Sequence, residues 1–221
     1  MSTIVLTHGA FHGGWCFAPL VAELEQRGVT CVLAELPLTD LTDDVAALTA
    51  VLDECEGPVT LLGHSYGGAV ITVAGVHRAV DRLVYLAALA PDVGENAGGG
   101  PAQIGEQFMA ALRFSDDGTM SIDHGQAAGL FYPDIDVESA NHWASFLRPG
   151  NTGGSVLVTE TAWRTRPSTY VVCADDPVVL AAGQREIAQR MGARVVEIAG
   201  DHSPMVARPA ELADLLVEAM R

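Results

Sequence analysis

One serine of this chain stands where it could act as a nucleophile. The segment Gly63-His64-Ser65-Tyr66-Gly67-Gly68 follows the apolar residues 59–62 and precedes a second apolar run at residues 69–74. A serine between glycines at a strand-to-helix junction is typical of a nucleophile elbow, a strained turn that small neighbours allow. An ordinary glycine-rich loop is the alternative. The strand before Ser65 and the helix after it favour the elbow.

His202 has the placement of a general base for that serine. A serine hydroxyl is a poor nucleophile at neutral pH and needs a base within hydrogen-bond reach, oriented by a third group. His202 lies in Gly200-Asp201-His202-Ser203-Pro204, between the last apolar run and the last helical pattern. Its alternative is a surface-loop histidine. The other histidines fit other roles: structural positions for His64 and His77, loop bracing for His8 and His12, and surface or pocket-wall positions for His124 and His142.

A carboxylate that fixes the tautomer of the histidine is expected after the fifth apolar run. The segment Cys173-Ala174-Asp175-Asp176-Pro177 supplies two candidates there. We expect Asp176, with Asp175 as the substitute and Asp92, which follows the fourth apolar run, as a third candidate. No pair of histidines has the spacing of a metal site, so we expect no metal.

The glycine-rich segment Thr7-His8-Gly9-Ala10-Phe11-His12-Gly13-Gly14-Trp15 follows the first apolar run. Acyl transfer needs two backbone N–H groups directed at the oxyanion, one from the residue after the nucleophile and one from a loop such as this. We therefore expect Ala10 and Tyr66 to be the donors. The glycines would let the backbone approach the substrate closely. The alternative is a tight turn with no further role.

The elements that must position these residues alternate along the chain. Short β-branched runs between longer helical patterns predict a mostly parallel sheet covered by helices on both faces, with strands buried on both sides. Helical spacing appears behind Asp40 or Thr42 and again after Pro209. The strands are expected at residues 3–7, 30–35, 59–63, 82–87, 169–173 and 194–198.

The alternation is interrupted between residues 92 and 166. Glycines and a proline open and close this stretch, and no clear strand pattern lies inside it. It contains too many aromatic and apolar residues for a disordered linker. We expect a small helical cap insertion at residues 92–166 over a core made of residues 1–91 and 167–221.

Bulk properties exclude several classes of function. Lys and Arg number 12 against 28 Asp and Glu, for a net charge of −16, which disfavours nucleic acid and anionic membranes as partners. No apolar run is long enough to span a membrane, and the start lacks a secretory pattern, so we expect a cytoplasmic protein. The four cysteines form no C-x-x-C pair and are expected to be reduced, buried thiols; they are Cys16, Cys31, Cys55 and Cys173.

With these motifs the chain resembles the α/β-hydrolase superfamily, and within it the methylesterase and hydroxynitrile-lyase-like group. The resemblance covers nearly the whole chain and rests on the first loop, the elbow and the two loops that carry Asp176 and His202. Leu130-Phe131-Tyr132 and Leu147-Arg148-Pro149 are similar to the group's cap. The resemblance implies a Ser65–His202–Asp176 triad, an oxyanion hole at Ala10 and Tyr66, a helical cap and no cofactor.

Two departures from the group bear on the reaction. Hydroxynitrile lyases of the group carry a lysine after the triad histidine and a threonine after the first-loop histidine, where this chain has Ser203 and Gly9. Lyase activity is therefore disfavoured, because cyanide would lose its cationic partner. The chain is also shorter than typical members, mostly in the cap, so we expect a more open pocket.

The leading functional hypothesis is a serine carboxylesterase, monomeric or homodimeric, that cleaves small, moderately apolar esters. One alternative uses the same triad on a thioester, a carbon–carbon bond or a biosynthetic cyclisation, since such reactions differ in pocket shape more than in catalytic residues. Another is a hydrolase-like receptor for a small molecule. The candidate substrate-binding residues are Phe11, Trp15, Phe108, Phe131, Tyr132, Trp143 and Met205.

Overall fold

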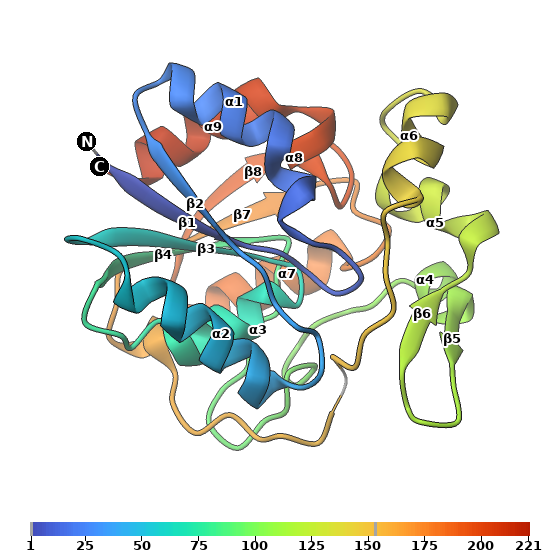
Figure 1. Cartoon of the computed structure of the whole chain (residues 1–221), viewed down its shortest axis with the longest axis horizontal. Helices are drawn as coiled ribbons and strands as arrows, with labels where there is room; N and C mark the ends of the chain where they lie inside the picture. Colours follow the sequence, from blue (N-terminus) through green and yellow to red (C-terminus); the bar gives the residue numbers. More distant parts are fainter. Residues whose placement is uncertain (1, 153) are drawn as a thin grey trace.

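A six-stranded parallel sheet forms the centre of the molecule (Figure 1). The structure is a computed structural model and describes residues 2–152 and 154–221. The strand order is β2-β1-β3-β4-β7-β8. Every neighbouring pair of strands is parallel, and the sequence predicted this parallel arrangement. The strands are β1 (Thr3–Thr7), β2 (Thr30–Ala34), β3 (Val59–His64), β4 (Val80–Leu86), β7 (Ser168–Cys173) and β8 (Arg194–Ile198).

The two outer strands differ from the expectation that all six are buried on both faces. The central strands are almost wholly buried, but β2 and β8 are partly exposed along their length. Leu33 and Val195 on these edge strands are open to solvent. A parallel sheet has two edges whatever its strands' composition, so an apolar run does not by itself indicate a central strand.

Helices cover both faces of the sheet (Figure 1). On one face lie η1 (Gly14–Phe17), α1 (Ala18–Gln26), α8 (Pro204–Ala207) and α9 (Pro209–Ala219), and on the other lie α2 (Leu41–Asp53), α3 (Gly67–Ala74), η2 (Ala162–Arg164) and α7 (Ala181–Met191). Each face has its own cluster of buried apolar side chains. None of the helices in the described part of the chain is long and apolar enough to cross a membrane.

Capping and spacing explain the helix α2. The carboxylate of Asp40 accepts a hydrogen bond from the backbone N–H of Asp43 at 2.9 Å, which satisfies one of the free donors at the helix start. Leu48 and Leu52 are fully buried on one face, as their spacing predicted. The helix ends at Asp53.

The chain between β4 and β7 departs from the sheet. It forms α4 (Glu106–Ala111), β5 (Leu112–Phe114), β6 (Met120–Ile122), α5 (His124–Phe131) and α6 (Val137–Ala144). Figure 1 shows these elements together beside the ends of the strands. We call this group the cap; its status as a separate domain, with boundaries at residues 92 and 166, stays a prediction.

The expected helical insertion contains the helices α4, α5 and α6, and it also contains an antiparallel hairpin of β5 and β6, which the sequence did not indicate. Each strand has three residues, too few to show an alternating pattern. A turn signal was present in Asp117-Gly118, where Gly118 has a φ of 84°.

All four cysteines are free thiols, but only two are buried. Cys16 and Cys173 lie in the core, whereas Cys31 on the edge strand β2 and Cys55 beyond the end of α2 are half-buried. The expectation of four buried thiols is corrected for these two.

Candidate active site

Ser65 lies on a strained turn between β3 and α3. Its φ is +54°, in the left-handed region that residues with a side chain rarely adopt. A Cβ on Gly63 would lie 2.5 Å from the carbonyl oxygen of Gly67, and one on Gly67 would lie 2.6 Å from that of His8. Glycines are therefore required on both sides of the serine, as expected for an elbow.

The loop after β1 passes directly against this turn. A Cβ on Gly9 would lie 2.8 Å from the Cβ of Ser65, so the close approach depends on glycine. Ala10, which follows Gly9, lines the same cavity as Ser65 and Tyr66. Within the described chain, neither the N–H of Ala10 nor that of Tyr66 donates to a backbone carbonyl in a loop or turn. Both predicted oxyanion donors therefore border the space beside the serine.

His202 and Asp176 contact each other in the interior. His202 Nδ1 lies 2.7 Å from Asp176 Oδ2, and the two residues are 1% and 4% exposed. A carboxylate oxygen accepts, so Nδ1 carries the proton and Nε2 is left as an acceptor. Asp176 also accepts hydrogen bonds from the N–H groups of Val178 and Val179 and from the side-chain amide of Gln184. These contacts hold the carboxylate in place for His202.

The other two candidate acids lie in different surroundings. Asp175 is exposed, and its carboxylate accepts from the N–H of Gly200 at 3.2 Å. Asp92 is paired with Arg164, whose guanidinium lowers the pKa of this carboxyl. The geometry favours Asp176 over both.

His64 connects the elbow to the loop that carries His202. Its Nε2–H donates to the carbonyl oxygen of His202 at 2.8 Å, and the centroids of the two rings are 4.7 Å apart. Because His64 directly precedes Ser65, this bond holds the backbone of the candidate base beside the candidate nucleophile. Burial, followed by the nearby His202 and His12, lowers the pKa of His64 well below its ordinary value. His64 therefore stays neutral.

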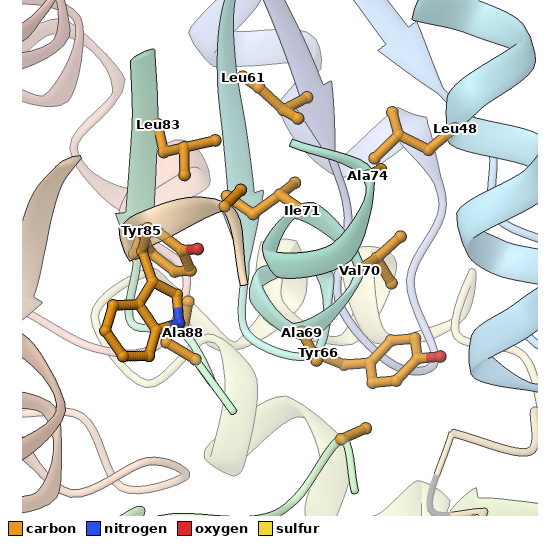
Figure 2. Packing of buried hydrophobic residues seen from close by; sticks show 14 of the residues in the cluster. Leu48, Leu61, Tyr66, Ala69, Val70, Ile71, Ala74, Leu83, Tyr85 and Ala88 are labelled. Atoms are coloured by element: carbon orange, nitrogen blue, oxygen red, sulfur yellow. The ribbon is translucent and has the colours of Figure 1, made fainter. Parts of the chain in front are cut away.

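A cavity of about 310 Å³ opens beside Ser65. Among its polar lining residues, Tyr66 directs its hydroxyl away, donating to Asp44 Oδ2 at 2.7 Å. Figure 2 shows the ring of Tyr66 extending from the start of α3 toward α2. None of the described residues that line the cavity is charged. They are Ala10, Phe11, Ser65, Tyr66, Leu89, Asn96, Gly98, Ile104, Phe108, Met109, Leu112, Met120, Thr152, Val178 and Val179.

Two of the seven predicted substrate-binding residues line this cavity. Phe11 and Phe108 are part of its wall. Phe131 lies just behind them, with its ring centroid 6.4 Å from that of Phe11 and 6.0 Å from that of His202.

The other four predicted residues lie elsewhere. Trp15 and Trp143 stack on each other with centroids 6.0 Å apart, and neither belongs to the cavity wall. Tyr132 is buried and hydrogen-bonded to His12, and Met205 is fully buried in the core beside α1 and α9. Aromatic character alone did not separate wall residues from core residues.

Several wall residues were missed by sequence reasoning. Val178 and Val179 come two and three residues after Asp176, so the expected place of the acid in the active site could have indicated them. Leu112 and Met120 lie on the hairpin that was not predicted. Nothing in the sequence singled out Thr152.

Within the described residues, no group of three or more His, Cys, Asp or Glu side chains is arranged to hold a metal ion.

Comparisons with known proteins agree with this architecture. A profile described as "Alpha/beta hydrolase family" matches residues 4–215. The alpha/beta hydrolase nvfD of Aspergillus novofumigatus is 28% identical, with 99% of this chain and 94% of that protein covered. The esterase PIR7B of Oryza sativa subsp. japonica is 25% identical over 97% of this chain and 94% of its own length. A crystal structure of the methylesterase MES16 from Arabidopsis superposes with a TM-score of 0.82 at 20% identity, covering 99% of this chain and 98% of its own.

Proposed function

Since this chain belongs to the alpha/beta hydrolase family, we propose that it is a cofactor-independent serine hydrolase of carboxylic esters that works through an acyl-enzyme on Ser65. The contact that carries the proposal is the 2.7 Å hydrogen bond between His202 and Asp176. It leaves Nε2 of the imidazole as the proton acceptor, while His64 holds the same residue against the elbow. The names of relatives such as the esterase PIR7B support ester chemistry.

The proposed reaction has two steps. The Oγ of Ser65 attacks the ester carbonyl carbon while His202 Nε2 takes the hydroxyl proton, and the carbonyl oxygen becomes an oxyanion held by the N–H groups of Ala10 and Tyr66. The C–O bond to the alcohol then breaks, and His202 returns the proton to the leaving oxygen. A water molecule, deprotonated by His202, next attacks the acyl carbon and forms a second oxyanion at the same donors. The C–O bond to Ser65 Oγ then breaks, and His202 gives the proton to Oγ, so that the acid and the free Ser65 hydroxyl are released.

The cavity supports small, neutral and moderately apolar esters as the substrate class. Its wall is largely aliphatic and aromatic, and no charged side chain of the described wall could pair with an ionic substrate. A buried charge without a partner is strongly unfavourable, so an acyl group with a free carboxylate or ammonium would bind poorly.

Turnover of short-chain aryl esters by the wild-type protein and by Ser65→Ala tests the proposal. We expect the variant to lose about 10⁴ to 10⁶ in kcat, as when a triad member is removed from a well-studied hydrolase. Equal turnover by the two proteins would refute it. Analysis of both products, the alcohol and the acid, separates ester cleavage from other uses of the same residues.

A further inference from the structure

Three consecutive carbonyl groups of the loop after β1 are each held by a hydrogen bond. The oxygen of Gly9 accepts from His8 Nδ1–H at 2.9 Å, and that of Ala10 accepts from His12 Nδ1–H at 2.8 Å. The oxygen of Phe11 accepts from the N–H of Arg148, beyond α6, at 2.9 Å. Phe11 itself has a φ of +65°, a conformation that a residue with a side chain adopts only when its surroundings impose it.

These bonds fix the direction of the N–H of Ala10. In a trans peptide the C=O of one residue and the N–H of the next point in opposite directions. His8 holds the carbonyl of Gly9, so the N–H of Ala10 is directed the other way. His12 holds the next peptide plane through the carbonyl of Ala10. Both planes that flank Ala10 are thereby immobilised.

The hydrogen bond from His12 depends on the cap. A carbonyl oxygen only accepts, so His12 carries its proton on Nδ1 and its Nε2 is an acceptor. The hydroxyl of Tyr132, at the end of α5, donates to this Nε2 at 2.9 Å. Both side chains are buried, with exposures of 1%. Burial lowers the pKa of His12 to about 3, so the imidazole is neutral and has one defined tautomer.

We infer that Tyr132 and His12 are positioning residues that aim the N–H of Ala10 at the developing oxyanion and so couple the cap to the catalytic loop. The inference rests on the proposed function, because it explains how the N–H of Ala10, a proposed oxyanion donor of that reaction, is oriented. The Tyr132 hydroxyl fixes the tautomer of His12, and His12 fixes the peptide after Ala10. Neither side chain belongs to the described wall of the cavity.

A purely structural role and a positioning role predict different kinetics. Loss of a buried hydroxyl would lower stability in either case. A misdirected oxyanion donor weakens the binding of the transition state more than the binding of the substrate. It therefore lowers kcat and leaves KM almost unchanged. Removing such a donor altogether costs about 10² to 10³ in kcat, so a displaced one should cost about tenfold or more.

Tyr132→Phe is the decisive variant, and Tyr85→Phe is its matched control. Tyr85 is also fully buried, and its hydroxyl lies 3.0 Å from that of Thr72, in the core shown in Figure 2. We expect Tyr132→Phe to lose at least about tenfold in kcat, with KM within about twofold. Its affinity for an aryl trifluoromethyl ketone, which forms a tetrahedral adduct, should fall in parallel. Tyr85→Phe should keep the wild-type kcat and the wild-type affinity for the ketone.

Equal kcat and equal ketone affinity in the two variants would overturn the inference while leaving ester hydrolysis by the wild type intact. Absence of ester turnover by the wild-type protein would refute the proposed function, and the inference with it. If Tyr132→Phe does not fold, nitrogen-15 NMR of the wild-type imidazoles gives the answer. The inference requires His12 to be protonated at Nδ1 between pH 5 and 8, and a proton on Nε2 would overturn it.

Discussion

His64 and His202 are joined by a hydrogen bond of 2.8 Å from the imidazole of the first to the backbone carbonyl of the second. The bond spans 138 residues of sequence and connects the elbow to the loop of the candidate base. The remaining nitrogen of His64, Nδ1, is buried without a partner in the described part of the chain. A proton there would place a charge in the interior, so the arrangement requires a neutral ring.

Buried neutral histidines predict a loss of stability in mild acid. The pKa of His12 is lowered to about 3 and that of His64 well below 6.5, chiefly by burial, while the unfolded chain has ordinary imidazoles near 6.5. Below pH 6.5 the unfolded state therefore binds more protons than the folded state, and the free energy of unfolding falls as the pH falls. Urea midpoints at pH 7.5, 6.5 and 5.5 measure this.

A constant urea midpoint over that range would contradict the neutral state of the two rings. In His12→Gln one of the two titrating groups is gone. We expect this variant to be less stable at pH 7.5 but to show a shallower decline between pH 6.5 and 5.5.

Replacing each candidate acid in turn tests the assignment of Asp176. Asp176→Asn would favour the wrong tautomer of His202, and kcat should fall by about 10⁴. Asp175→Asn and Asp92→Asn should stay within a few-fold of the wild type, because their carboxylates contact Gly200 and Arg164 instead. Steady-state kinetics with one aryl ester measures all three. A larger loss in Asp175→Asn than in Asp176→Asn would reverse the assignment.

Tyr66→Phe should distinguish the role of the Tyr66 side chain from the role of its backbone N–H. The hydroxyl donates to Asp44, which is fully buried, so its removal leaves one carboxylate oxygen without that donor. The expected cost is about 1 to 3 kcal/mol in the free energy of unfolding. The N–H proposed for the oxyanion is unchanged, so kcat should stay within a few-fold. Urea unfolding together with ester kinetics checks both, and an unchanged stability would contradict the interpretation.

Narrowing the cavity should change the preferred length of the acyl chain. Ile104 lines the cavity and its backbone pairs with Val179. In Ile104→Trp the indole should fill space that a longer acyl group needs, so octanoate esters should lose about tenfold more in kcat/KM than acetate esters. Val137→Trp, on the exposed face of α6, is the control and should not alter the ratio. An unchanged ratio in Ile104→Trp would place the acyl group elsewhere.

Local sequence signals predicted the parallel sheet and the alternation of its strands with helices along the chain. The apolar runs had strand length, helical spacing lay between them, and the glycines around Ser65 are required by contacts under 3 Å. The resemblance to the esterase and methylesterase group was also confirmed, by relatives such as PIR7B and by the family profile. These features depend on residues close together in the chain, which is why the sequence alone indicated them.

Features that depend on distant partners were harder to predict. Each strand of the cap hairpin is only three residues long, so it shows no strand pattern. The positions of β2 and β8 at the edges depend on the order of the whole sheet. Tyr132 was expected in the pocket because it is aromatic, yet its hydroxyl bonds to His12, 120 residues away. Nothing in the local sequence distinguishes an aromatic residue of the cavity wall from one that is buried and hydrogen-bonded behind it.

Labelling with a fluorophosphonate, followed by intact mass measurement and peptide mapping, tests the central claim most directly because it needs no knowledge of the substrate. We predict a single adduct on the peptide that contains Ser65, no adduct in Ser65→Ala, and labelling of His202→Ala that is slower by about 10³ or more. An adduct at another residue, or wild-type labelling rates in His202→Ala, would contradict the account.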